Sequence, residues 1–441
     1  MKAKTILNVG FDDTDSPKGM CTTFLAYKIV DFLKKERVNF LDYPKLVRFN
    51  PNIPWKTRGN GAVGLKIETD NPQKIKKKIK DLVIKYSDTK NGANPAVVFL
   101  ENDTIPSDFK KFSEIALYEL VNRSYAKKFA KKNLESFFLG NGQGLLGAIG
   151  VIGYQFNDQT VELLSYRTKN NFGKKRNISK KSVKKMKEKT YPFTFNNFDE
   201  EKNKILISPH GPDPVFYGIR GEDSKSLLKA AKLIKTKEKL DGYLIFKSNQ
   251  GTSAHLKNKI DVSELKPYSS GKITGLVSEE PKMERGGHVF FSITSNENKV
   301  RCAVYEPTGL ASEISGLKKG DKIMIGGSVR KASKKHPRIV NVEFIKILKL
   351  VKNLKSTNPL CKKCNKKMKS KGKNQGFQCV KCGKKAKSKQ VKIISRKIKK
   401  QLYLPVPSAH RHLTRPIQRI GISNRNIRFD DSAPWFKIFK N

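Results

Sequence analysis

Two pairs of cysteines near the C-terminus limit most strongly what this chain can fold into. Cys361 and Cys364 form one Cys-x-x-Cys pair, and after fourteen residues Cys379 and Cys382 form another. Four thiolates at this spacing are typical ligands of tetrahedral Zn²⁺, and a complete set of four leaves no open position for catalysis. The segment has few apolar side chains for a core, so it needs the metal to fold. The spacing predicts a structural zinc ribbon over residues 357–386.

The charge of the chain indicates a polyanionic partner. In 441 residues, 91 lysines and arginines outnumber 39 acidic residues, which gives a formal charge of +52. An imbalance of this size is typical of proteins that bind nucleic acid. A membrane surface is the alternative, but the longest apolar run, residues 145–154, is rich in glycine and too short to span a bilayer. The N-terminus has no signal-peptide pattern, so we expect a cytoplasmic protein that contacts no membrane.

An acidic loop lies between an expected strand and an expected helix near the N-terminus. Its three carboxylates are Asp12, Asp13 and Asp15. The start of a helix binds phosphate through free N–H groups, and Gly19 allows a ligand to approach the backbone. Three carboxylates would repel a bare phosphate but suit Mg²⁺, which bridges polyphosphate oxygens. We interpret the loop as a metal-nucleotide site; the alternative is a solvated turn in which Ser16 or Thr22 caps the helix.

The first two thirds of the chain contain the same order of elements twice. We expect strands at 4–9, 43–49, 61–68 and 95–100 with helices at 21–36 and 72–87, and then strands at 161–166, 204–208, 215–220 and 242–248 with helices at 178–187 and 224–235. Each set reads βαββαβ, the order of a ferredoxin-like unit. A helical stretch at 109–138 and a small-residue helix or strand after Gly147 lie between the two sets.

Three loops of these units contain candidate ligand-binding residues. In the loop 48–61, Asn50, Lys56, Arg58 and Asn60 could contact phosphates or bases, or Trp55 could simply pack the loop down. The glycines Gly142 and Gly144 could let the backbone wrap a phosphate, although the motif is not Walker A. Asp213, Glu222 and Asp223 would suit a cationic small molecule; alternatively, Glu222 and Asp223 favour the start of the next helix.

The remaining segments resemble nucleic-acid-binding modules. Five short strands at 270–277, 288–294, 299–305, 321–330 and 338–347 predict an OB-fold β-barrel. Residues 387–441 are rich in lysine and arginine, and we expect them to cross a phosphate backbone. His410 and His412 are expected to pack or form hydrogen bonds, with no second metal.

Taken together, these motifs resemble the archaeal tRNA 2-agmatinylcytidine synthetases of the TiaS family. The resemblance covers almost the full length and rests on residues 12–23, 50–60, 140–145, 211–221 and 409–413. The chain departs from the family pattern at Phe24 and Gln143, where tyrosine and arginine are expected. The resemblance implies an α+β multidomain protein with a kinase-like catalytic domain that binds ATP (1–138), a ferredoxin-like domain (139–262), an OB-fold (267–350), a zinc ribbon (357–386) and a basic C-terminal tail (387–441).

The resemblance also implies an activity and its partners. The family joins agmatine to C2 of the wobble cytidine in the AUA-decoding isoleucine tRNA, which has a CAU anticodon. It first phosphorylates a threonine of its own, which corresponds to Thr22, and the cytidine. Activating the C2 oxygen as a leaving group requires ATP and Mg²⁺.

We assign roles to residues on this basis. Metal coordination falls to Asp12, Asp13 and Asp15, transition-state stabilisation to Lys56 or Arg58, nucleotide binding to Gly19, Thr23, Gly142 and Gly144, and agmatine binding to Asp213, Glu222 and Asp223. Two alternatives stay open: a non-catalytic RNA-binding protein in which the OB-fold and ribbon do the work, and an enzyme that uses another amine, such as lysine.

Overall fold

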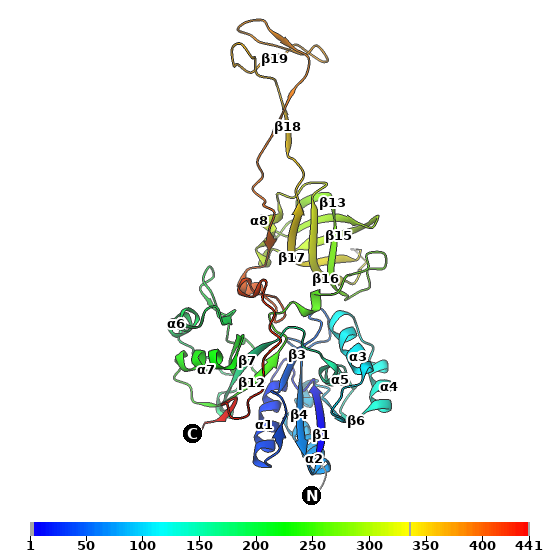
Figure 1. The fold of residues 1–441 in the computed structure, drawn as a ribbon, viewed down its shortest axis with the longest axis vertical. Coiled ribbons are helices and arrows are strands. Elements are labelled where there is room, and N and C mark those ends of the chain that lie inside the picture. Colours follow the sequence, from blue (N-terminus) through cyan, green and yellow to red (C-terminus); the bar gives the residue numbers. More distant parts are fainter. Residues whose placement is uncertain (1–3, 335–336, 440–441) are drawn as a thin grey trace.

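The computed structural model describes residues 4–334 and 337–439. An α/β body contains both ends of the described chain, a β-barrel lies next to it, and a long two-stranded stalk extends from the barrel to a small terminal module (Figure 1). Within the described residues, no helix has the length and apolar character needed to cross a bilayer.

The first half of the body is one βαββαβ unit, as expected. Its elements are β1 (Thr5–Asp12), α1 (Thr22–Lys35), β3 (Lys45–Arg48), β4 (Gly61–Thr69), α2 (Pro72–Tyr86) and β5 (Ala96–Glu101), and the short β2 (Asn39–Phe40) pairs with β4. The strand order is β5-β1-β4-β3, that of a ferredoxin-like unit. On β5, Val97 and Phe99 face one core while Ala96 and Val98 face another, because successive side chains of a strand point to opposite faces. This half of the sheet is therefore buried on both sides.

The second half repeats the same topology with one difference from the expected strands. Its elements are β7 (Thr160–Arg167), α6 (Lys180–Thr190), β8 (Thr194–Phe195), β11 (Val215–Gly221), α7 (Ser224–Leu233) and β12 (Leu240–Ser248), in the order β12-β7-β11-β8. The strand expected at 204–208 is not part of this sheet: β10 (Lys204–Ile205) pairs with β9 (Phe198–Asp199) instead. Positive φ angles turn the chain at Asn196 (54°), before β9, and at Asn203 (47°), in the turn between β9 and β10.

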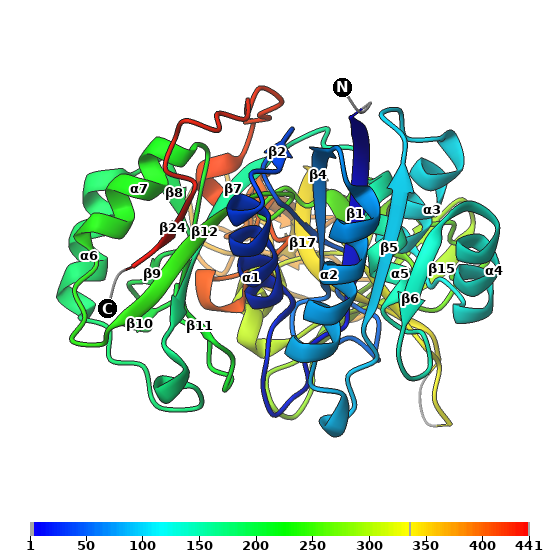
Figure 2. The same cartoon turned by 90° about the horizontal axis from the view of Figure 1, so that it is seen from below.

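The two halves form one continuous sheet. β3 and β12 pair in parallel, with Lys45 opposite Lys247 and Leu46 opposite Ser248, so that the sheet has eleven strands (Figure 2). The C-terminal strand β24 (Phe436–Ile438) also pairs with β12, and the adjacent Trp435 is buried in the core that spans both halves. The halves are thus parts of one folded body.

Between the two units, the chain crosses the face of the first unit that α1 and α2 leave open. The elements are α3 (Ser107–Tyr118), α4 (Arg123–Asn133), β6 (Glu135–Phe138) and α5 (Leu145–Gly153). The single helical stretch expected at 109–138 is therefore wrong: Asn122 caps a second helix, and residues 135–138 pair with β5. The small-residue segment is a helix, and its glycines allow close packing. A Cβ on Gly10 would lie 2.0 Å from the Ala148 carbonyl oxygen, and one on Gly153 would lie 1.9 Å from that of Phe109.

The barrel has the strands and connectivity predicted for an OB-fold. Its strands are β13 (Ser270–Met283), β14 (Val289–Ser295), β15 (Asn298–Val304), β16 (Lys322–Arg330) and β17 (Ile339–Lys349). β13 pairs with β14 and β16, and β15 pairs with β17, which closes the barrel. The short α8 (Leu310–Ile314) connects the third strand to the fourth.

The terminal module lies at the far end of the stalk. The stalk consists of β18 (Leu354–Thr357) paired with β22 (Gln390–Ile393), and the module contains β19 (Lys369–Ser370), β20 (Phe377–Gln378) and β21 (Lys385–Ala386). The chain then returns through β23 (Leu402–Tyr403), which pairs with β17, to the body. Residues 387–439 thus contact the stalk, the barrel and the body in turn. The short 3-10 helices are η1 (Thr89–Asn91), η2 (Lys169–Asn171), η3 (Ala254–Leu256), η4 (Glu306–Thr308), η5 (Pro407–Ala409) and η6 (Ile417–Arg419).

Candidate active site

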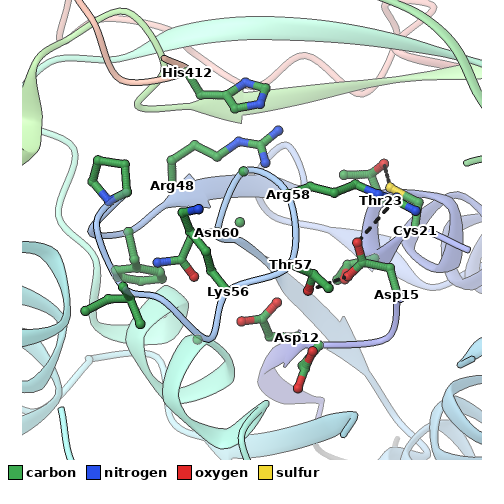
Figure 3. A pocket seen from close by; sticks show the side chains of 18 of the residues that line it. Asp12, Asp15, Cys21, Thr23, Arg48, Lys56, Thr57, Arg58, Asn60 and His412 are labelled. Carbon is green, nitrogen blue, oxygen red and sulfur yellow. Dashed lines mark hydrogen bonds and ion pairs between the residues drawn. The ribbon is translucent and has the colours of Figure 1, made fainter. Parts of the chain in front are cut away.

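A cavity of about 1480 Å³ lies between the two βαββαβ units. The first unit contributes the loop after β1, the start of α1 and the loop between β3 and β4. The second unit contributes residues of β7 and β11, and the returning C-terminal segment adds residues 411–413 (Figure 3). The cavity therefore contains side chains from segments that are hundreds of residues apart in sequence.

The acidic loop is held in place by Arg58. The Arg58 guanidinium donates hydrogen bonds to the carbonyl oxygens of Met20 (2.8 Å), Ser16 (3.0 Å) and Gly19 (3.3 Å), and it lies 3.3 Å from the Asp15 carboxylate. Thr57 donates to the other oxygen of Asp15 at 3.3 Å. Arg58 thus acts on the shape of the loop, since its N–H groups already have protein partners.

The three aspartates predicted as metal ligands all line the cavity, and their carboxyl groups resist ionisation. Burial and the neighbouring Asp13 raise the pKa of Asp12 well above its usual range. Burial and Asp15 raise the pKa of Asp13 to about 6, and burial raises that of Asp15. Within the described chain, neither Asp12 nor Asp13 forms an ion pair with a lysine or arginine, whereas Asp15 pairs with Arg58. A buried group of this kind favours a cation among its oxygens.

The helix that follows the loop begins at the cavity without a side-chain cap. Cys21 occupies the N-cap position and forms no capping hydrogen bond. Thr22 and Thr23, the first two residues of α1, line the cavity, and each is only 5% exposed. The Thr14 hydroxyl donates to that of Thr22 at 3.1 Å. An uncapped helix start presents N–H groups and the positive end of the helix dipole to an anion.

Lys56 is the second predicted cation of the neighbouring loop, and it points into the cavity (Figure 3). Burial and the nearby Arg411 lower its pKa. It forms no ion pair with any carboxylate of the described residues, so of Lys56 and Arg58 it has the charge available for a ligand. Trp55 also lines the cavity; it is 61% exposed, and its ring contacts that of Tyr268 with the centroids 6.2 Å apart.

The three glycines predicted to bind the nucleotide lie outside the lining of the cavity. Gly19, Gly142 and Gly144 do not line the cavity, although Asn141 and Gln143 do. A Cβ on Gly144 would lie 2.7 Å from the backbone nitrogen of Ala96, so glycine is needed there for close packing. Gly142 has a φ of +80° and forms part of a turn.

The three acidic residues assigned to agmatine do not form a group. Asp213 lines the cavity between Arg176 (3.4 Å) and Arg58 (3.9 Å), and burial raises its pKa. Glu222 pairs with Arg419 at 2.5 Å, outside the cavity lining. Asp223 caps α7 by accepting a hydrogen bond from the Ser226 backbone N–H at 2.7 Å, which is the alternative role considered from the sequence.

Four further cavity residues were not identified as site residues from the sequence. Glu162 and Arg220, on adjacent strands, lie 3.1 Å apart, and Arg48 at the end of β3 lies 3.9 Å from Glu162. His412 Nδ1 lies 2.7 Å from Gln250 Oε1 and 3.0 Å from Arg220 Nη2. Burial and the two arginines lower the His412 pKa well below its usual range. The one available signal was a charged residue, Glu162, within a run of apolar strand residues.

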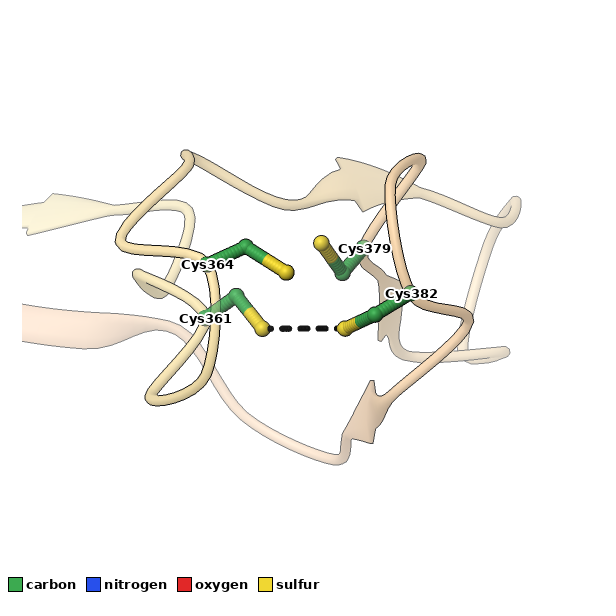
Figure 4. Close-up of side chains that lie close together, drawn as sticks. All are labelled: Cys361, Cys364, Cys379 and Cys382. Carbon is green, nitrogen blue, oxygen red and sulfur yellow. Dashed lines mark hydrogen bonds between the residues drawn. The ribbon is translucent and has the colours of Figure 1, made fainter.

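The four cysteines of the terminal module form the predicted metal centre (Figure 4). Their Sγ atoms all lie within 4.8 Å of one another, and among the described residues this is the one group of three or more ligands that meets this distance. The arrangement fits a structural Zn²⁺. Met368 and Phe377 pack beside the thiols, which is a very small core.

The fold and the site define a class of protein: a multidomain α+β protein with a zinc ribbon, a β-barrel and a cavity with acidic and basic walls. Three family models match the chain, described as the TiaS TCKD domain (residues 8–74), the TiaS FLD domain (142–255) and the TiaS C-terminal zinc ribbon domain (358–398). The isoleucine-tRNA 2-agmatinylcytidine synthetase TiaS of Cenarchaeum symbiosum (strain A) is 47% identical over 438 residues, 99% of this chain and 98% of that protein. The chain belongs to the TiaS family.

Solved structures agree with this assignment. The chain is similar to a complex of TiaS with its isoleucine tRNA and ATP, with a TM-score of 0.85 and 35% identity over 96% of this chain and 100% of that one. It is also similar to a complex of TiaS with the same tRNA, AMPCPP and agmatine, with a TM-score of 0.83 and 33% identity over the same shares of the two chains.

Proposed function

We propose that this protein is an ATP-dependent ligase that joins agmatine to C2 of the wobble cytidine in the AUA-decoding isoleucine tRNA. The observation that carries the proposal is the cavity, in which an acidic loop and an uncapped helix start lie opposite buried arginines. Similarity over 96% of the chain to a protein solved with an isoleucine tRNA, AMPCPP and agmatine supports the same reading. The product base would pair with A instead of G, so that AUA is read.

The chemistry requires a phosphorylated intermediate. The C2 carbonyl of cytosine is a poor electrophile, so a phosphoryl group from ATP is first transferred to its oxygen. The agmatine amine then forms a bond to C2, loses a proton, and expels the oxygen as inorganic phosphate. A kinase-like step on Thr22 belongs to the same proposal, because its hydroxyl lies at the start of α1 beside the acidic loop.

The donor set in the cavity fits Mg²⁺. Mg²⁺ takes oxygen ligands and is usually held by one or two carboxylates together with substrate phosphates. The aspartates do not bring three oxygens within 4.8 Å of one another, so Asp12 and Asp13 would supply one or two ligands, with Asp15 fixed by Arg58. When bound, the ion neutralises charge on the phosphate oxygens during transfer.

The other residues of the cavity position the reactants. Lys56 faces the phosphates and compensates their charge. Thr22 and Thr23 direct the N–H groups of the α1 start at the nucleotide. Asp213, the one acid of the predicted trio in the cavity, attracts the cationic agmatine, while Arg58 and Arg176 limit its free charge. The barrel and the lysine-rich ribbon bind the rest of the tRNA, distant from the reacting base.

The decisive experiment is a ligation assay with the full chain. A transcript of the isoleucine tRNA is incubated with ATP, Mg²⁺ and labelled agmatine, then digested and analysed by mass spectrometry. We expect label on the wobble nucleoside, dependent on ATP, and none on a transcript with uridine at that position. Incorporation of lysine in place of agmatine would change the amine donor, and tight RNA binding without any incorporation would favour a non-catalytic binding protein.

A further inference from the structure

Arg48 differs from the other buried arginines of the body in having almost no protein partners. Its side chain is 13% exposed, and its guanidinium donates no hydrogen bond to any described residue. Its nearest carboxylate, Glu162, is 3.9 Å away. By contrast, Arg167 is 1% exposed and donates hydrogen bonds to Glu238 and to the carbonyl oxygens of Lys174 and Lys175. The Arg48 Nε is buried without a hydrogen-bond partner among the described residues. Because a buried N–H without a partner is costly, the Arg48 position calls for a ligand.

The backbone around Arg48 leaves space for its guanidinium at the cavity. A Cβ on Gly61 would lie 2.6 Å from Arg48 Nη1, and one on Gly59 would lie 2.7 Å from it. The glycines of this loop thus let the guanidinium reach the cavity, which it lines. In Figure 3 it lies near His412, on the side of the cavity away from Asp12.

The charges around Arg48 do not balance. Arg48 and Arg220 share one carboxylate, that of Glu162, and His412 beside them is held neutral by burial and by the two arginines. Gln250 supplies only an uncharged amide to the group. Within the described chain, Arg48 and Arg220 thus have one carboxylate within ion-pair distance between them, and the more distant Asp12 and Asp15 form no ion pair with either, which favours an anionic ligand at this wall.

We propose that Arg48, supported by Arg220, binds a phosphoryl group of a substrate at this wall of the cavity. The inference rests on the proposed function for the choice of ligand: agmatine is a cation and is repelled, whereas ATP and tRNA both bring phosphates. The planar guanidinium matches two phosphoryl oxygens at once. The site joins the end of β3, the sheet of the second unit and the C-terminal segment, so it is complete only when both units and that segment are folded together.

The test compares Arg48→Met with Arg167→Met in the full chain. Because the Arg48 side chain donates no hydrogen bond to a described residue, Arg48→Met should leave the thermal midpoint unchanged or raise it, while Arg167→Met should lower it. Removing a charged hydrogen-bond donor should weaken phosphate binding by about ten- to hundredfold. The dissociation constants are measured for a non-hydrolysable ATP analogue with Mg²⁺ and, separately, for the tRNA transcript. Weaker binding of the analogue would assign the phosphate to ATP, and weaker binding of the transcript would assign it to RNA.

Unchanged dissociation constants for both ligands would overturn the proposal, as would a midpoint loss equal to that of Arg167→Met without any binding defect. Should Arg48→Met fail to fold, Arg48→Lys keeps the charge but not the planar donor pair. Tripolyphosphate should raise the thermal midpoint of the natural protein more than that of Arg48→Lys, and equal shifts would reject the site. These measurements need no ligation, so a natural protein that fails to ligate agmatine would disprove the proposed function independently.

Discussion

The two βαββαβ units have the same strand order but differ in how the starts of their helices are capped. In the second unit, Ser179 caps α6 and Asp223 caps α7, and in the first unit Asn71 caps α2. Among these four helices, all within the described residues, α1 alone begins without a side-chain cap, and it begins at the cavity. The comparison teaches that a shared topology does not fix a site. Of these four helix starts, the uncapped one is the start that faces the cavity.

The two walls of the cavity have opposite charges. The acidic wall comes from the first unit, which brings the three buried aspartates. The basic wall is shared, because Arg48 comes from the first unit and Arg220, with the partly compensated Glu162, comes from the second. A metal-bound polyphosphate suits a position between such walls. Substitution of an aspartate in the first unit should therefore lower activity, whereas substitution of a helix cap in the second unit should lower stability alone.

The largest effect is expected from Asp12→Asn in the first unit. Loss of a carboxylate that holds the metal should lower ATP-dependent agmatine incorporation by at least about hundredfold, as is typical when a group that stabilises transition-state charge is removed. The affinity for tRNA should not change, because the barrel and ribbon are untouched. Both quantities are measured on the same preparation, and full activity in Asp12→Asn would remove the acidic loop from the mechanism.

A phosphorylation assay distinguishes the roles of Thr22 and Thr23, the first two residues of α1. After incubation with ATP and Mg²⁺, we expect one phosphate on the peptide that contains Thr22, located by tandem mass spectrometry. Thr22→Val should abolish this label and Thr23→Val should retain it, because the Thr23 hydroxyl contacts Cys21 Sγ at 3.1 Å. An active natural protein that gains no phosphate would disprove the phosphothreonine step.

The pH dependence of metal binding tests the acidic wall. The pKa of Asp13 is raised to about 6 by burial and by Asp15, so the folded state binds this proton more tightly than the unfolded state. Without metal, the free energy of unfolding should fall as pH rises from 4 through 6, and Asp13→Asn should remove that part of the slope. Mg²⁺ competes with the proton, so its half-saturating concentration should rise by up to about tenfold per pH unit below 6. A flat profile would show that Asp13 ionises normally.

The smallest effect is expected from Asp223→Ala in the second unit. Loss of the cap to Ser226 should lower the free energy of unfolding by about 1 kcal/mol and leave the KM for agmatine unchanged. Denaturant titration and steady-state kinetics measure the two values. A raised KM with normal stability would instead place Asp223 at the substrate, as the sequence grouping suggested.

Local patterns made much of the fold predictable. The Cys361–Cys382 segment has its ligand spacing within a short stretch, and the barrel strands follow from apolar alternation between glycine-rich turns. The predicted order of strands and helices along the chain was also correct for both βαββαβ units. Two-residue strands such as β8 carry too little pattern to predict, and the helical stretch at 109–138 was wrong because Asn122 and the pairing of β6 with β5 interrupt it.

The site was predictable only where it is local in sequence. The aspartates, Thr22 and Lys56 lie in two loops of the first unit, and all of them line the cavity. The opposite wall joins Arg48, Glu162, Arg220 and His412, which the fold alone brings together. Glu222 and Asp223 were grouped with Asp213 because they are close in sequence, but Arg419 and the start of α7 engage them instead.

The most direct test of the difference between the two units is a calorimetric titration of a non-hydrolysable ATP analogue into the natural protein, Asp13→Asn and Asp223→Asn. We predict Mg²⁺-dependent binding to the natural protein and to Asp223→Asn, and binding at least about tenfold weaker to Asp13→Asn. Equal, Mg²⁺-dependent affinity in Asp13→Asn, or a loss confined to Asp223→Asn, would contradict a nucleotide site at the uncapped start of α1.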